Sequence, residues 1–419
     1  MKKLKAGSLQ LVTFIVVVIA LLLSAFVILI HIHKQFRIKT NHVIETVGLV
    51  DKGINYALQK ENINADTVSL SLYEDDYKSL EVYKSFWGVF EKVYTKAKIK
   101  NTVLTKMALV GSKRDQKKQT ALVLKDNNKP LVLVGKTKIE GKAYLPKRGV
   151  KSGNIAGASY YGENYIYGEM ALSKSFPKID KTLLTQIKAL CKGVGTNNKE
   201  IEYIDLYASK KHVNSFENPL QLIYSTTEIR LSNVEISGHI SVQSQAKIIV
   251  DASSKLTDVI LIAPVIEIRN NVKGVFQAFA TDRIGVAEHV SLSYPSALVL
   301  YRDYVKDESN KPYMIYVGNH SEMNGNIIAL GASLPNNYEA QIKINTNALI
   351  KGSIYCEQNL ELRGTVFGTV YTNNFIIKED NSIYQNHLFN ARISSADLES
   401  EFVNLLIEQS DKGIAKWLY

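Results

Sequence analysis

The residues best suited to chemistry are acidic side chains in the strand-rich half of the chain. These are Asp251, Asp258, Asp282 and Glu288, with His289 directly after the last of them. Paired carboxylates serve as general acid and base in polysaccharide cleavage, and clustered carboxylates bind Ca²⁺. The acids are scattered along the sequence and form no Asp-Asp or Asn-x-Asp pair of the kind such sites use. We therefore expect no catalytic residues, and a polysaccharide-active enzyme is the least favoured function.

Other reactive motifs are missing from the sequence as well. The densest acidic run, residues 74–76, follows a predicted strand and is expected to be a solvated turn. There is no GxSxG, HExxH or CxxC motif and no glycine-rich phosphate-binding loop. Two cysteines, Cys191 and Cys356, define neither a zinc site nor a disulfide framework, and both a pair and two buried thiols fit the sequence. We expect no metal and no cofactor.

The charge of the chain is mildly basic. Its formal net charge is +11, from 51 Lys+Arg against 40 Asp+Glu over 419 residues. Such an excess suits an anionic membrane surface, acidic glycans or nucleic acid, or simply a lysine-rich solvated surface. The basic run at residues 113–118 lacks the interleaved aromatic residues on which bases stack. We expect no nucleic-acid partner.

One stretch determines how the chain is organised. Leu11–Ile30 is an uncharged run dominated by Leu, Ile, Val and Phe. Its insertion into a bilayer is favoured by about −5 to −10 kcal/mol, and as a helix it spans roughly 30 Å, the thickness of the bilayer core. A cleaved signal peptide has a shorter apolar region followed by small residues, whereas here the helical pattern continues. We predict one retained span, with lysine-rich residues 1–10 as a cytoplasmic leader.

The leader, a glycine and the apolar span together resemble the N-terminus of type IV pilins and minor pseudopilins of the PilX-like kind. In that family a prepilin peptidase cuts after a glycine, so the resemblance implies cleavage after Gly7 and a new terminus at Ser8. The family usually carries Glu at the fifth mature position, where this chain has Val12. Residues 36–58 resemble the helix that follows the span in minor pilins. The resemblance implies pilin-like or other envelope proteins as partners of this helix.

Beyond the span, the helix is predicted to continue as a stalk, so that residues 11–60 form one element. An apolar stripe recurs there at spacings of three and four, which places its members on one helical face: Val43, Val47, Val50, Ile54 and Ala57. This stripe needs a partner. The partner is either the globular part of the same chain or neighbouring helices in an assembly.

The rest of the chain is predicted to be mainly β. Residues 61–205 are expected to form a β-rich exported domain with one short helix at 179–189, capped by Asp180. Residues 206–378 carry very short apolar segments at regular intervals, which suit a parallel β-helix (solenoid) better than hairpins. A β-sandwich is the alternative. Residues 351–377 resemble bactofilin-type polymer-forming solenoids in the phrases KGSIY and LRGTV.

A C-terminal capping helix is predicted within residues 379–419. Ser394 and Asp397 resemble a capping box, and apolar residues from Leu398 to Leu406 follow at helical spacing.

These features predict a single-pass, membrane-anchored structural component of a bacterial cell-envelope filament or secretion machine, similar to a minor pseudopilin. It is expected at the inner membrane, with the N-terminus cytoplasmic and the later domains periplasmic or extracellular. The expected partners are the lipid bilayer and pilin-like or other envelope proteins, with cell-wall glycan as a further candidate. The alternative function is a signal-anchored scaffold or glycan-binding solenoid.

Overall fold

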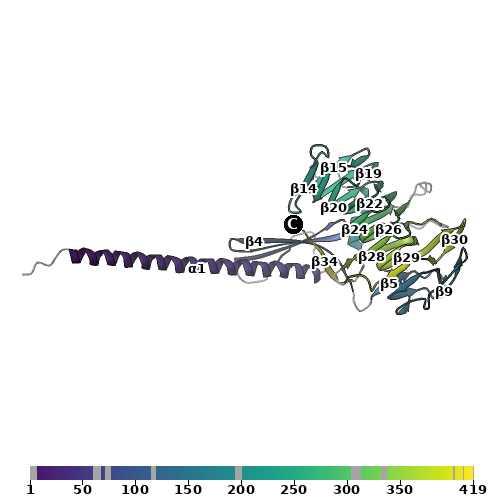
Figure 1. Ribbon diagram of the computed structural model, residues 1–419, viewed down its shortest axis with the longest axis horizontal. Coiled ribbons are helices and arrows are strands. Elements are labelled where there is room, and N and C mark those ends of the chain that lie inside the picture. The colour runs from purple at the N-terminus through teal and green to yellow at the C-terminus, as the bar shows by residue number, and fades with distance from the viewer. Residues whose placement is uncertain are drawn as a thin grey trace, which may run out of the picture. The chain divides into compact units, whose positions relative to one another are not determined.

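A computed structural model describes residues 7–59, 68–70, 77–114, 119–193, 201–302, 313–331, 337–399, 402–408 and 410–418. The protein is mainly β with one long N-terminal apolar helix, as predicted (Figure 1). Its residues divide into two compact units. Unit 1 comprises Met1–Tyr83 and Tyr94–Lys106, and unit 2 comprises Lys84–Val93 and Met107–Tyr419.

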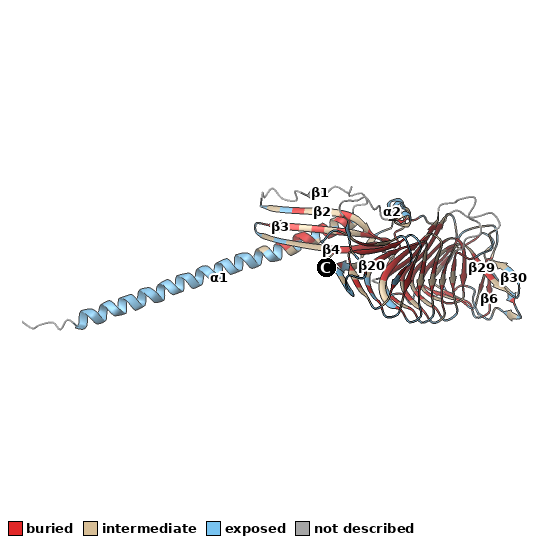
Figure 2. Cartoon of the chain, turned by 90° about the horizontal axis from the view of Figure 1, so that it is seen from above, coloured by how far each residue is buried: buried red, intermediate tan, exposed pale blue. Residues whose placement is uncertain are grey.

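Helix α1 (Gly7–Gln59) is continuous over 53 residues. Its apolar first part is long and apolar enough to cross a membrane, and no residue of that window is buried. Figure 2 shows this exposure as the pale blue length of the helix. The buried residues all lie near its C-terminal end, from Thr46 to Ala57.

Within unit 1, the C-terminal part of α1 packs on a β-sheet. A Cβ on Gly53 would lie 3.0 Å from Leu80 Cδ1 and 3.1 Å from Thr95 Cγ2, so a larger residue there would force these side chains to move by a few tenths of an ångström. Two ion pairs flank the contact. Lys78 Nζ lies 2.6 Å from Glu45, and Lys106 Nζ lies 2.5 Å from Asp51.

The sheet beside α1 is antiparallel, and its strands β2 to β4 contribute residues to both units. Its described strands are β1 (Val68–Leu70), β2 (Lys78–Trp87), β3 (Phe90–Ile99), β4 (Thr102–Lys113), β33 (Val403–Asn404) and β34 (Lys412–Leu418). In unit 2 the turn between β2 and β3 is held by Gln277. Its side chain accepts from the Val89 N–H at 2.8 Å and donates to the Trp87 carbonyl at 3.0 Å.

The largest part of unit 2 is a long parallel sheet in a solenoid-like arrangement. Its strands are β5 (Thr120–Leu124), β7 (Lys138–Glu140), β8 (Lys142–Leu145), β12 (Met170–Leu172), β13 (Glu202–Tyr203), β14 (Lys211–Asn214), β15 (Gln221–Ser225), β16 (Ile229–Leu231), β17 (Glu235–Gly238), β18 (Ile240–Ser244), β19 (Lys247–Val250), β20 (Lys255–Ile262), β21 (Val265–Ile268), β22 (Lys273–Ala280), β23 (Arg283–Val286), β24 (Ser291–Arg302), β25 (Met314–Val317), β26 (Glu322–Gly331), β27 (Ile342–Ile344), β28 (Leu349–Leu362), β29 (Thr365–Glu379) and β32 (Arg392–Ser394). The predicted alternative, a β-sandwich, does not fit this parallel pairing.

Smaller elements complete the unit. They are β6 (Leu131–Val134), β9 (Val150–Ser152) and β31 (His387–Phe389) in one sheet, the hairpin β10 (Asn154–Ile155) and β11 (Ala158–Ser159), β30 (Ser382–Gln385) antiparallel to β29, and α2 (Lys181–Lys192). Helix α2 confirms the predicted short helix and its cap. The Asp180 carboxylate accepts from the N–H groups of Thr182 at 2.9 Å and Leu183 at 3.1 Å.

The core of the parallel sheet is a ladder of aligned aliphatic residues. Ile248 aligns with Ile266 and Ile266 with Ile284, and all three are fully buried. Because isoleucine lies over isoleucine on successive strands, each side chain is buried against an identical side chain of the next strand. A second set of aligned residues within the sheet consists of glycines. Gly325, Gly352 and Gly368 align with φ between +140° and +147°, and a Cβ on any of them would lie within 2.0 Å of the carbonyl oxygen of the preceding strand.

The parallel sheet joins distant parts of the chain. Leu122 in β5 aligns with Val370 in β29, and Ala143 in β8 aligns with Met170 in β12. The sheet therefore draws strands from both sides of residues 205 and 206, between which the sequence predicts a domain boundary.

The predicted C-terminal capping helix is wrong. The described residues after 379 form short strands joined by turns and no helix, and Ser394 lies in β32 instead of capping a helix. The physical reason is that β4 offers an open edge. Residues of β34 pair along it from Met107 to Ser112, so backbone hydrogen bonds to a neighbouring strand replace those of a local helix.

Candidate functional site

The acidic residues singled out in the sequence do not come together. Each has a partner of its own: Asp251 with Arg230 at 2.7 Å, Asp258 with Lys416 at 2.6 Å, Asp282 with Arg302 at 2.9 Å, and Glu288 with Asn319 at 3.0 Å. His289 stacks on His320, with ring centroids 5.3 Å apart. Among the described residues no group of three or more His, Cys, Asp or Glu could hold a metal ion. Residues 74–76 lie outside the described residues.

Both cysteines are free thiols. Burial raises the pKa of Cys191 and of Cys356 to about 12, so each thiol stays protonated at neutral pH. Cys356 lies in the aliphatic core, where it packs as a small apolar residue.

The predicted stripe on α1 is divided by the fold. Val50, Ile54 and Ala57 are buried, so the globular part of the same chain covers them. Val47 is half-buried, and Val43 is 49% exposed. Three further residues of α1 are buried that the apolar periodicity did not single out: Thr46, Leu49 and Gly53.

The N-terminal part of α1 presents an apolar surface on every side of the helix. Phe14, Leu21 and Phe26 are each about two-thirds exposed (66%, 66% and 65%). A helix that is hydrophobic all round is stable only when a membrane or other apolar surroundings cover it. Gly7 begins this helix, and a Cβ there would meet nothing within 4 Å. Ser8 is exposed.

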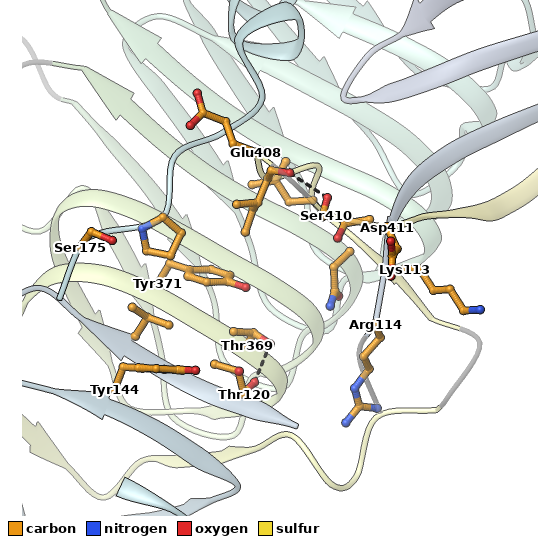
Figure 3. Close-up of a pocket in the computed structure, with 16 residues that line it drawn as sticks. Lys113, Arg114, Thr120, Tyr144, Ser175, Thr369, Tyr371, Glu408, Ser410 and Asp411 are labelled. Atoms are coloured by element: carbon orange, nitrogen blue, oxygen red, sulfur yellow. Dashed lines mark hydrogen bonds between the residues drawn. The ribbon is translucent and has the colours of Figure 1, made fainter. Parts of the chain in front are cut away.

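Unit 2 also contains a cleft of about 390 Å³, which sequence reasoning did not find (Figure 3). It lies over the outer face of β5, β8 and β29. Its lining residues are Ser112, Lys113, Arg114, Thr120, Val123, Tyr144, Ser175, Pro177, Thr369, Tyr371, Asn404, Leu405, Ile407, Glu408, Ser410 and Asp411. Its volume is within the range of small-molecule sites.

The floor of the cleft follows from strand register. Tyr371 of β29 aligns with Val123 of β5, which aligns with Tyr144 of β8. The two tyrosines therefore share one face of the sheet and stand two strands apart, roughly 10 Å. Figure 3 shows both rings on one side of the cleft. Burial raises the pKa of Tyr371 to about 12, so its phenol is neutral.

The opposite wall is the C-terminal segment around residues 404–411, which is held by backbone and side-chain hydrogen bonds. The Glu408 N–H donates to the Lys178 carbonyl at 3.0 Å, and the Lys113 N–H donates to the Asp411 carbonyl at 2.7 Å. The Arg114 guanidinium donates to the carbonyls of Ser395 and Leu398. Burial lowers the pKa of Arg114 from its ordinary value, and its two hydrogen bonds tie the end of β4 to residues 395 and 398.

One polar atom in the cleft has no partner. Asn404 Oδ1 is buried and accepts no hydrogen bond within the described protein. An orphaned buried acceptor costs about 1 to 3 kcal/mol unless a ligand or water satisfies it.

No protein-family model, curated protein or solved structure matches this chain. The structure thus establishes a long apolar helix, an antiparallel sheet and a long parallel sheet, and it identifies no family.

Proposed function

We propose that this protein is a single-pass, membrane-anchored structural component of a bacterial cell-envelope filament or secretion machine, similar to a minor pseudopilin. The observation that carries the proposal is α1. One continuous helix joins an apolar stretch, exposed on all sides, to a C-terminal part that packs on the sheet of unit 1. This arrangement suits an element that inserts into a membrane at one end and carries folded β-structure at the other.

In this proposal residues 1–7 are a leader removed between Gly7 and Ser8, and α1 then packs in the inner membrane or against pilin-like helices. The exposed Val43 belongs to the part of the stripe left for such partners. The β-rich units are exported and act by contact, and the protein is not an enzyme. The parallel sheet is a β-helix that presents an extended surface to envelope partners.

The test is the N-terminus of the mature protein, determined by mass spectrometry in cells that contain prepilin peptidase. A start at Ser8 supports the proposal, and Gly7→Leu is expected to leave the leader attached. An intact Met1 in the wild-type protein would remove the pseudopilin-like part of the proposal.

A second candidate is a signal-anchored scaffold or glycan-binding solenoid. The length of the parallel sheet and the cleft on its outer face favour it. Side-by-side filaments of the full-length protein in electron micrographs, or retention on cell-wall glycan, would support this candidate.

A further inference from the structure

The charges of the cleft in unit 2 cancel. The lining contains two basic residues, Lys113 and Arg114, and two acidic residues, Glu408 and Asp411, so its formal net charge is zero. A phosphate- or carboxylate-rich polymer needs an excess of Lys or Arg, as charge-assisted and bidentate hydrogen bonds require. The ligand that suits this cleft is therefore neutral.

The remaining lining is rich in hydroxyl groups. Ser112, Thr120, Ser175, Thr369 and Ser410 line the cleft beside the two tyrosines. The Thr369 and Ser410 hydroxyls already donate to the carbonyls of Thr120 and Ile407, so toward a ligand they serve as acceptors. Acceptors of this kind match a ligand that itself carries many hydroxyl groups.

Tyr144 and Tyr371 add apolar faces with polar tips. Both are half-buried, stand on one face of the sheet and are two strands apart. Such amphipathic rings suit a ligand that is apolar on one face and polar at its edge. A sugar ring has this character, since its C–H groups gather on a face and its hydroxyls at the rim.

An extended peptide is disfavoured by the pairing of the strands beneath the cleft. Peptides that bind by strand addition need an unpaired strand edge. Here β29 is paired with β28 and β5, β5 with β29 and β8, and β8 with β5 and β12. The cleft thus exposes a sheet face, with no free edge for a peptide backbone.

We infer that this cleft binds a neutral oligosaccharide, with Tyr144 and Tyr371 as its platform and the surrounding hydroxyl groups as its hydrogen-bond partners. The inference rests on the second candidate function, the glycan-binding solenoid, in one respect only: that function would make envelope glycan the natural source of the oligosaccharide. It does not depend on membrane anchoring or on cleavage after Gly7, so its failure would leave those proposals standing.

The experiment is calorimetric titration of the full-length protein in lipid nanodiscs with two neutral probes, a tetramer of glucose and a tetramer of N-acetylglucosamine. We expect at least one to bind, and Tyr144→Ala to weaken binding about tenfold. Ser175→Trp, at an exposed loop position, is expected to abolish binding by filling the cleft. Tyr161→Ala is the matched control, because Tyr161 is 70% exposed and does not line the cleft.

The outcomes separate cleanly. Binding that Ser175→Trp abolishes and Tyr161→Ala leaves unchanged supports the inference, even if Tyr144→Ala does not fold. Absence of binding to both probes at millimolar concentration overturns it. Sugar binding that persists in the Ser175→Trp variant also overturns the inference. So does a result in which neither sugar binds, but an unstructured peptide binds saturably and Ser175→Trp blocks that binding.

Discussion

The glycine ladder predicts a large effect from a single methyl group. Gly352 in β28 has φ +140°, and an added Cβ would lie 2.0 Å from the carbonyl oxygen of Gly325 on the neighbouring strand. Its other neighbours include a second glycine, Gly368, whose own Cβ would clash with the Gly352 carbonyl at 1.8 Å. The clashing atoms are backbone atoms fixed by strand pairing, so they cannot move aside at low cost.

We therefore expect Gly352→Ala to lower the free energy of unfolding by roughly 2 to 6 kcal/mol. About 1 to 3 kcal/mol comes from the unfavourable φ, and about 1 to 3 kcal/mol comes from overpacking against the neighbouring strand. The fluorescence of Trp87, which is 4% exposed within unit 2, can follow unfolding in denaturant.

Gly285→Ala is the matched control, because Gly285 also lies in a strand of the parallel sheet, β23. A Cβ there would meet only side-chain atoms of Arg283, at 3.6 Å or more, and the φ lies outside the left-handed region. We expect this variant to change stability by less than about 1 kcal/mol. Equal unfolding midpoints for Gly352→Ala and Gly285→Ala would refute the reasoning.

Three further predictions concern other parts of the fold. Burial lowers the pKa of Lys84 from 10.5 to about 8. The free energy of unfolding of the wild type should therefore rise relative to that of Lys84→Met as the pH goes from about 8 to 10.5, and a difference that does not change with pH would contradict this. Asp180→Ala removes the cap of α2 and should cost about 1 kcal/mol in the same assay, whereas Asp180→Asn should retain most of it. Gly53→Leu should destabilise unit 1 by about 1 to 3 kcal/mol, because the larger side chain would clash with Leu80 and Thr95. Gly48→Ala should not destabilise it, because the added Cβ meets nothing within 4 Å. Equal thermal stability of the two variants would argue against the close packing of the helix on the sheet.

Local features of this fold could be predicted from the sequence. The apolar run at residues 11–30 indicates a long helix because each residue adds to the same signal. The short apolar segments after residue 206 indicate stacked parallel strands, because such strands are stable only against neighbours of their own kind. The cap at Asp180 could also be predicted, because it is local: its hydrogen bonds reach residues only two and three positions away.

Features that depend on distant pairing could not be predicted. The apolar spacing after Ser394 fits a helix, and only the open edge of β4 makes a strand the better structure. The alignment of Leu122 with Val370 leaves no periodic signal in either segment. The cleft draws its lining from β4, β5, β8, β29, the segment before α2 and the C-terminal segment. A tyrosine on the outer face of a strand, such as Tyr144 or Tyr371, is the one signal that could have indicated it.

The central claim is that α1 holds this protein in a membrane, and extraction of membranes with alkaline carbonate tests it most directly. The wild-type chain should stay with the membrane pellet. Replacing the exposed Leu21 and Leu22 by lysine costs roughly 7 kcal/mol of insertion free energy, which removes most of the driving force for insertion, and should move part of the protein to the soluble fraction. Recovery of the wild-type protein in the soluble fraction would contradict the account.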